Sequence, residues 1–215
     1  MKGAIFDMDG LMFDTERLYK QAWRAAGKEM GIDITDEFHR AVCGTSGEEM
    51  VRIIRAYYPD CDPDPLWRRC YAICLQMQRE FLPEKPYLHE ILYTSKEIGL
   101  RLAVASSTAP ELVRENLSTA GVDGYFDAVV SGLQVAHGKP APDIFLFASE
   151  KLGLDPKDCY VLEDSFNGVR SGYAAGCRTI MIPDLVQPTP EIRSMCTAVC
   201  PDLHLAAEFI KSDIL

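Results

Sequence analysis

The sequence lacks any long hydrophobic run, and its apolar stretches fall far short of the roughly 18 residues that a membrane-spanning helix requires. It also lacks a basic surplus, because 22 Lys and Arg residues stand against 32 Asp and Glu residues, a net charge of −10. These absences exclude a membrane span and argue against a protein that grips nucleic acid or an anionic membrane through a basic face. A single small phosphate could still bind locally.

Signals for export and for a cysteine-bound metal are missing as well. Residues 1–10 have the pattern of a strand that ends in acidic residues, which differs from a signal peptide. The eight cysteines contain no Cys-x-x-Cys pair of the kind that zinc and redox sites use. We therefore expect a soluble cytoplasmic protein in which the cysteines are small buried hydrophobic residues in a reducing compartment.

The chain does contain what a folded α/β protein needs: 215 residues, 47% of them hydrophobic. Several short runs are apolar throughout, as in strands buried on both faces of a parallel sheet. Between them lie helical patterns that begin at a proline and stop at a glycine, such as 110–121 and 142–153. This alternation predicts a doubly wound, Rossmann-like parallel sheet. The expected strands are residues 2–6, 100–105, 126–130, 160–162 and 179–182.

Residues 16–82 differ from the rest, because four helical patterns follow one another with no strand-like run between them. Ser46 to Glu49 has the pattern of a capping box, and Asp64-Pro65 of the start of the next helix. We interpret 16–82 as an all-helical cap domain inserted into an α/β core formed by 1–15 and 83–215. The two crossings between them are candidate hinges.

Polar residues gather where the expected strands end. In an open parallel sheet, the ligand crevice lies outside the carboxyl ends of the strands. The residues at the strand ends are Asp7, Asp9, Ser106, Glu163 and Asp164, and Lys139 lies in a loop just before a helix. The four carboxylates of this set would repel one another in one crevice unless a cation lay among them, and hard oxygen ligands suit Mg²⁺.

This set of groups suits phosphoryl transfer. A carboxylate beside Mg²⁺ can attack phosphorus to give an aspartyl-phosphate, and a second carboxylate can protonate the leaving oxygen and later activate water. A lysine and a hydroxyl can hold the phosphoryl oxygens. Gly10 would let the turn after Asp7 close, since glycine adopts conformations that other residues do not.

Four stretches carry a resemblance to a known family: FDMDGLMFDTE (6–16), VASST (104–108), GKPAPDIF (138–145) and LEDSFNGV (162–169). With these motifs in this order, the chain resembles the haloacid dehalogenase superfamily of phosphatases and phosphomutases. The position of the expected cap makes it similar to the β-phosphoglucomutase-like branch, and the resemblance covers essentially the whole chain.

The resemblance implies roles for the acidic residues. Asp7 would be the nucleophile that becomes phosphorylated, and Asp9 the general acid and base. Mg²⁺ would be bound by the Asp7 carboxylate, the Asp9 backbone carbonyl and Asp164. Glu163 would lie close by, either as a direct ligand or as a structural carboxylate.

The resemblance also implies that Ser106 and Lys139 bind the transferring phosphoryl group. Simpler interpretations of these two residues are a helix cap and a solvated surface lysine. Dehalogenases of the superfamily lack the acid two residues after the nucleophile, so the presence of Asp9 favours phosphoryl transfer over dehalogenation.

The expected activity is hydrolysis of a small phosphorylated metabolite such as a sugar phosphate. In the mutase, a cap arginine grips the second phosphate and a histidine follows the first motif, but the corresponding positions here hold Gly47 and Tyr19. Arg52 or Arg55 could replace the arginine, so a sugar phosphomutase stays an alternative. A catalytically silent phosphometabolite-binding module is an alternative of another class. Nothing in the sequence demands more than a monomer.

Overall fold

The computed structural model describes residues 2–43, 45 and 47–214. The chain divides into two compact units, one formed by Met1–Phe13 with Glu84–Leu215 and the other by Asp14–Pro83. The second unit thus extends the expected range 16–82 by two residues at its start and one at its end. We call the first unit the core and the second the cap.

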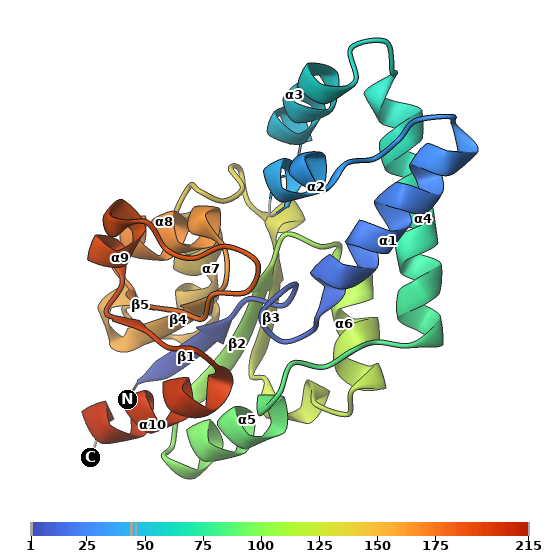
Figure 1. Ribbon diagram of the computed structural model, residues 1–215. Helices are drawn as coiled ribbons and strands as arrows, with labels where there is room; N and C mark the ends of the chain where they lie inside the picture. Colours follow the sequence, from blue (N-terminus) through green and yellow to red (C-terminus); the bar gives the residue numbers. More distant parts are fainter. Residues whose placement is uncertain (1, 44, 46, 215) are drawn as a thin grey trace. The chain divides into compact units, whose positions relative to one another are not determined.

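The core contains a six-stranded sheet in the order β3-β2-β1-β4-β5-β6, in which every neighbouring pair is parallel (Figure 1). This is the strand order of a doubly wound fold, as the alternation of strand and helix predicts. The strands are β1 (Gly3–Phe6), β2 (Arg101–Ser106), β3 (Ala128–Ser131), β4 (Cys159–Glu163), β5 (Arg178–Met181) and β6 (Ala198–Val199).

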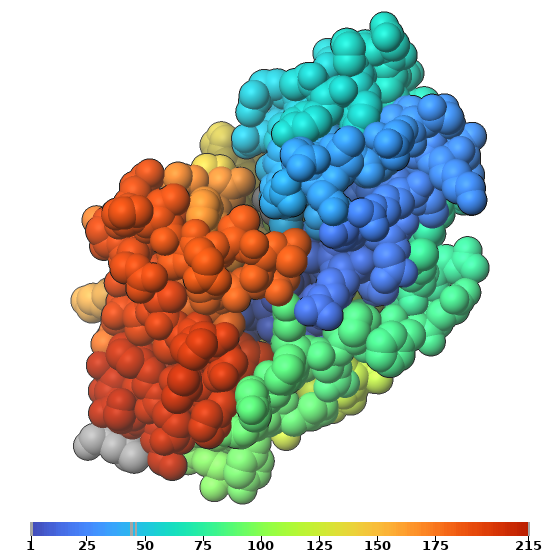
Figure 2. All heavy atoms as spheres, viewed as in Figure 1, coloured from blue at the N-terminus to red at the C-terminus, as the bar shows by residue number. Residues whose placement is uncertain are grey.

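Helices cover the sheet, so that successive residues of β2, such as Leu102 and Ala103, are both fully buried. On one face, Phe145 of α7 packs in a cluster with Ile5 and Val161 of the sheet. Helices α5 and α10 pack against each other, and their atoms lie side by side in Figures 1 and 2. The core helices are α5 (Leu88–Glu97), α6 (Pro110–Thr119), α7 (Asp143–Leu152), α8 (Phe166–Ala174), α9 (Pro190–Met195) and α10 (Leu203–Ile214).

Helices in the core begin near the prolines and end at the glycines that the sequence pattern predicts. Helix α6 begins at Pro110, and Gly153 ends α7 with a positive φ of 66°. The strand ends differ slightly from expectation: the run 126–130 becomes β3 at Ala128–Ser131, and β6 was not predicted at all. A strand of two residues is too short to leave a hydrophobic pattern, and its pairing with β5 comes from the packing of the chain around it.

The cap consists of α1 (Thr15–Glu29), α2 (Asp36–Val42), α3 (Gly47–Tyr57) and α4 (Pro63–Glu80), which are the four helices that the sequence predicts. Trp23 and Phe38 are buried in its centre, with ring centroids 5.2 Å apart. The expected start of the last helix was wrong by two residues, because the Asp62 side chain accepts a hydrogen bond from the Asp64 backbone N–H. The expected cap at Ser46 lies outside the described residues.

The two crossings between the units run beside each other at the core. Phe13 and Glu84 form an antiparallel bridge, and the Lys85 backbone N–H donates to the Met12 carbonyl at 2.9 Å. Along the described chain, no helix combines the length and apolar character needed to cross a bilayer. All eight cysteines are free thiols, four of them buried and four partly exposed.

Candidate active site

The site lies where the order of the strands reverses, between β1 and β4. Asp7 directly follows β1, and its backbone N–H donates to the Leu162 carbonyl of β4 at 3.0 Å. Glu163 ends β4 and Asp164 follows it. A ligand crevice forms at such a reversal because the loops that leave the two strands diverge. The carboxylates predicted from opposite ends of the chain are therefore neighbours.

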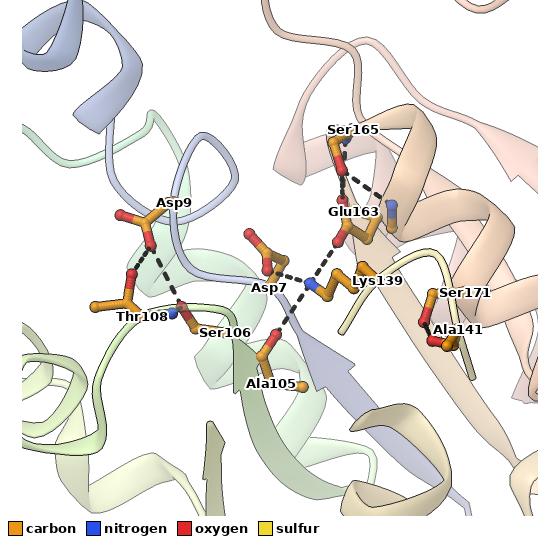
Figure 3. Close-up of polar contacts among 11 residues, drawn as sticks. Asp7, Asp9, Ala105, Ser106, Thr108, Lys139, Ala141, Glu163, Ser165 and Ser171 are labelled. Atoms are coloured by element: carbon orange, nitrogen blue, oxygen red, sulfur yellow. Dashed lines mark hydrogen bonds and ion pairs between the residues drawn. The ribbon is translucent and has the colours of Figure 1, made fainter. Parts of the chain in front are cut away.

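Lys139 holds two of these carboxylates together (Figure 3). Its Nζ atom lies 2.5 Å from Oδ1 of Asp7, 2.6 Å from Oε1 of Glu163 and 3.2 Å from the Ala105 carbonyl oxygen. The three charged side chains are 8%, 9% and 1% exposed for Lys139, Asp7 and Glu163. Lys139 is thus a buried ion-pair partner of the predicted nucleophile and not a solvated surface lysine.

Glu163 is fixed on both of its oxygens. Oε1 accepts from Lys139, while Oε2 accepts from both the backbone N–H and the hydroxyl of Ser165 at 3.0 Å. A Cβ atom at Gly168 would lie 1.7 Å from Oε1, so α8 can begin this close to the carboxylate only with glycine there. These contacts make Glu163 a rigid acceptor that orients Lys139. Ser165 and Gly168 were not singled out by the sequence, although both lie inside one of the four motifs.

Gly10 and Asp164 explain the tight turn after β1. Gly10 has a φ of +86°, and a Cβ built on it would lie 2.3 Å from Oδ2 of Asp164. Both the backbone conformation and the close approach of the carboxylate therefore require glycine. The predicted role of Gly10 in letting this turn close agrees with the geometry.

The donor set at this end of the sheet fits a hard divalent cation. Asp7, Glu163 and Asp164 are all buried, and each offers an oxygen within 4.8 Å of the others. Lys139 is the basic group that pairs with this set in the described structure. Three buried carboxylates facing one ammonium leave negative charge that is costly away from water, and oxygen ligands of this kind suit Mg²⁺.

The pKa values follow from this imbalance. Burial raises the pKa of Asp7 above its ordinary value, and Glu163 and Asp9 add to the rise while Lys139 opposes it. For Lys139, burial works to lower the pKa, but Asp7 and Glu163 outweigh burial and raise it. Lys139 therefore stays an ammonium, whereas the raised pKa of Asp7 shows that its ionised form is disfavoured in this group. A bound cation would favour the ionised form of Asp7.

Asp9 faces a different set of partners. Its Oδ2 accepts a hydrogen bond from the Thr108 hydroxyl at 2.8 Å and a longer one from Ser106 at 3.3 Å (Figure 3). The Asp9 side chain is not part of the carboxylate group formed by Asp7, Glu163 and Asp164. Ser106 is buried beside Asp9 and does not cap α6, whose N-cap residue is Ala109. Thr108 ends the VASST motif but was given no role from the sequence, and its hydrogen bond to Asp9 was not predicted.

Comparisons with known proteins identify the family. A model of the haloacid dehalogenase-like hydrolase family matches residues 4–182. The chain belongs to this family. The resemblance stated from the four motifs is therefore confirmed, and the protein is an enzyme of the hydrolase class.

Two curated relatives illustrate the match. A phosphorylated carbohydrates phosphatase of Thermotoga maritima is 34% identical over 181 residues, which are 84% of this chain and 84% of the relative. Hexitol phosphatase B of Escherichia coli K12 is 30% identical over 219 residues, covering 99% of this chain and 96% of the relative. The core and the cap thus both lie within the matched length.

Solved structures agree with the fold. CbbY from Rhodobacter sphaeroides, in complex with phosphate, superposes with a TM-score of 0.80 at 27% identity, covering 96% of this chain and 99% of that one. A β-phosphoglucomutase from Clostridium difficile gives a TM-score of 0.81 at 21% identity, covering 100% and 97%. At that identity, the second likeness shows the fold alone.

Proposed function

We propose that the protein is a Mg²⁺-dependent phosphomonoesterase that acts on a small sugar phosphate through an aspartyl-phosphate on Asp7. The observation that carries the proposal is the buried group in which Lys139 binds Asp7 and Glu163 while Asp164 lies alongside. The same group supplies a nucleophile, an electrostatic clamp and a cation site within one end of the sheet.

Asp7, Asp164 and the Asp9 backbone carbonyl would hold the Mg²⁺, with Glu163 adjacent. When bound, the ion supplies charge neutralisation that lets an anionic phosphate approach an anionic nucleophile. Both oxygens of Glu163 already accept hydrogen bonds. We therefore assign Glu163 chiefly to orienting Lys139.

The chain's own residues account for both halves of the reaction. In the first half, an Asp7 carboxylate oxygen bonds to phosphorus while the bond from phosphorus to the ester oxygen breaks, and Asp9 gives that oxygen its proton. In the second half, Asp9 takes a proton from water, whose oxygen attacks phosphorus and releases phosphate and the Asp7 carboxylate. Lys139 and Ser106 bind the phosphoryl oxygens throughout.

The substrate class rests on the relatives. The names of the curated relatives include a phosphorylated carbohydrates phosphatase, a hexitol phosphatase and, at 32% identity, a fructose-1-phosphate phosphatase of Escherichia coli K12. Each acts on a small polyhydroxylated phosphate ester according to its name. A panel of hexose, hexitol and ketose phosphates is therefore the first set of substrates to test.

Hydrolysis is favoured over a mutase by two residues of the cap. Gly47, which stands at the position of the mutase arginine, is exposed and offers no side chain. Tyr19, in place of the mutase histidine, stacks on Trp67 with centroids 6.1 Å apart and planes 15° apart. Arg52 pairs with Glu49 on the same helix, with both side chains largely exposed. These contacts give Tyr19 a packing role within the cap.

The test is release of inorganic phosphate from this panel by the wild-type protein with Mg²⁺, beside a coupled assay for conversion of a hexose 1-phosphate to its 6-phosphate. We expect phosphate release without isomerisation, and Asp7→Asn should remove it. Isomerisation stimulated by a bisphosphate would instead establish the mutase. Binding of sugar phosphates without any turnover would identify a silent binding module and reject the proposal.

A further inference from the structure

The carboxylate of Asp9 accepts a hydrogen bond from Thr108, a residue to which the proposed reaction gives no chemical step. Thr108 Oγ1 donates to Oδ2 of Asp9 at 2.8 Å, which is the shorter of the two hydroxyl contacts to that oxygen. Figure 3 shows Asp9 turned toward the loop after β2, apart from the Lys139 group. The hydrogen bond from Thr108 therefore helps to set the orientation of the Asp9 side chain.

Ser106 cannot fill this role as well as Thr108. Its hydroxyl lies 3.3 Å from Asp9 and also accepts a hydrogen bond from the Thr108 backbone N–H at 3.0 Å. Under the proposed function, the same hydroxyl turns to a phosphoryl oxygen once substrate binds. The hydrogen bond from Thr108 is then the one that can persist through the reaction.

Thr108 is itself held in place from the next strand. The hydroxyl of Ser131, fully buried at the end of β3, donates to the Thr108 carbonyl oxygen at 2.7 Å. A Cβ atom on Gly132 would lie 3.3 Å from the Ser107 Cα, so the β3 end packs closely on this loop. Hydrogen bonds thus connect the end of β3 to Thr108 and Thr108 to Asp9. Thr108 is therefore held in place by the carboxyl end of the sheet.

We propose that Thr108 is a positioning residue that holds Oδ2 of Asp9, so that Oδ1 carries the proton delivered to the leaving oxygen. The inference rests on the proposed function, because it assumes that Asp9 is the general acid. In that step, the bond from Oδ1 to its proton breaks as the new O–H bond of the leaving alcohol forms. Thr108 exchanges no proton and needs no contact with the substrate.

This role predicts a dependence on the leaving group. A 4-nitrophenolate leaves readily without a proton, phenolate less so, and an alkoxide such as that from benzyl phosphate needs protonation most. The three esters are similar in size, so differences in binding are small. Because kcat/KM covers the steps up to departure of the leaving group, it isolates the half-reaction in which Asp9 acts as an acid.

The experiment compares Thr108→Val with wild type on 4-nitrophenyl, phenyl and benzyl phosphate with Mg²⁺. General acid catalysis contributes roughly 10²–10⁴-fold, so a misplaced acid should lower kcat/KM for benzyl phosphate by about 10- to 100-fold and for the nitrophenyl ester by no more than about threefold. Phenyl phosphate should fall between them. Thr108→Ser, which keeps the hydroxyl, should restore most of the loss for the benzyl ester.

Thr179→Val is the matched control. Thr179 is a fully buried threonine of β5, and its hydroxyl has no hydrogen-bond partner among the described residues. The same change of side chain there should leave all three kcat/KM values as in wild type. If Thr108→Val does not fold, as judged by circular dichroism, Thr108→Ala provides the same comparison.

Equal losses on the three esters, or no loss on any, would overturn the inference, because a merely structural or substrate-binding residue would affect all three alike. Failure of Thr108→Ser to restore activity would do the same. If the wild-type protein itself released no phosphate from any ester, the proposed function would be rejected. That result differs from the outcomes above, which concern only the variants.

Discussion

The two ends of the β-sheet carry charge in opposite ways. At the carboxyl end, the ammonium of Lys139 pairs with the buried carboxylates of Asp7 and Glu163, and the buried carboxylate of Asp164 lies near both. At the other end, the carboxylate of Asp213, in the last turn of α10, accepts hydrogen bonds from Arg178 and from the Tyr160 hydroxyl. Lys2 lies 3.8 Å from the same carboxylate. Among the ion pairs of the described residues, the first end has one cation for a group of three carboxylates, and the second has two cations, Arg178 and Lys2, for one carboxylate.

The pKa values record this contrast. Burial raises the pKa of Asp7, whereas the hydrogen bond from Arg178, helped by Tyr160, lowers the pKa of Asp213 well below its ordinary range. A carboxylate with enough donors stabilises the fold. A buried one with too few destabilises it and retains the capacity to bind a cation or react. This difference in pKa distinguishes the Asp213 cluster, which connects α10 to the sheet, from the Asp7 cluster, which is the candidate active site.

The largest expected effect comes from removing the Lys139 ammonium at the carboxyl end of the sheet. Lys139→Met should lower kcat/KM for the best phosphate ester by about 10²–10³-fold, the usual cost of a lost donor to a developing charge. Arg178→Met removes a charge of the same sign at the far end and should leave kcat/KM unchanged. Steady-state phosphate release measures both. Comparable losses in the two variants would mean that the ends do not differ in function.

The next effect concerns the cation that the acidic end is expected to bind. Mg²⁺ at 100 times its dissociation constant should stabilise the folded protein by about 2.7 kcal/mol, and excess chelator should reverse this. Asp164→Asn should abolish the Mg²⁺-dependent rise in Tm, because it removes a buried ligand. Asp213→Asn should retain the rise in full. Thermal unfolding by circular dichroism gives the result without any assay of activity.

The smallest effect is the pH dependence of the structural end. Because the pKa of Asp213 is lowered in the folded state, its contribution to stability is full above the unfolded value of about 4 and declines as the pH falls below it. Asp213→Asn should therefore lower the free energy of unfolding by about 1 kcal/mol at pH 7. The deficit should shrink in urea titrations at pH 3. A deficit that stayed constant with pH would show that the charge of Asp213 is not what stabilises this end.

Much of the site was accessible from the sequence because of the geometry of parallel strands. Asp7 and Glu163 each lie at the end of a short apolar run, and strands of a parallel sheet present their carboxyl ends at one edge. Their neighbourhood could therefore be inferred without knowing the strand order. The cap helices were equally accessible, since their hydrophobic periodicity is long and regular.

The missed features depend on single contacts between distant loops. The bond from Thr108 to Asp9 joins residues 99 apart, and nothing in the local pattern of Thr108 distinguishes an anchor from a helix cap. The closeness of Gly168 to Glu163 shows only when α8 is placed against the end of β4. Strand β6 is too short for a pattern to reveal.

The sequence by itself determined the first five strands of the sheet, the inserted helices and the set of polar groups at the strand ends, because these follow from local hydrophobic patterns and from the chain direction of parallel strands. Only the tertiary structure decided which of those groups meet. Lys139 reaches Asp7 across 132 residues and Glu163 across 24, and Asp9 turns instead to Thr108. Such pairings depend on how the loops pack over the sheet edge, where a shift of one hydrogen-bond length exchanges one partner for another.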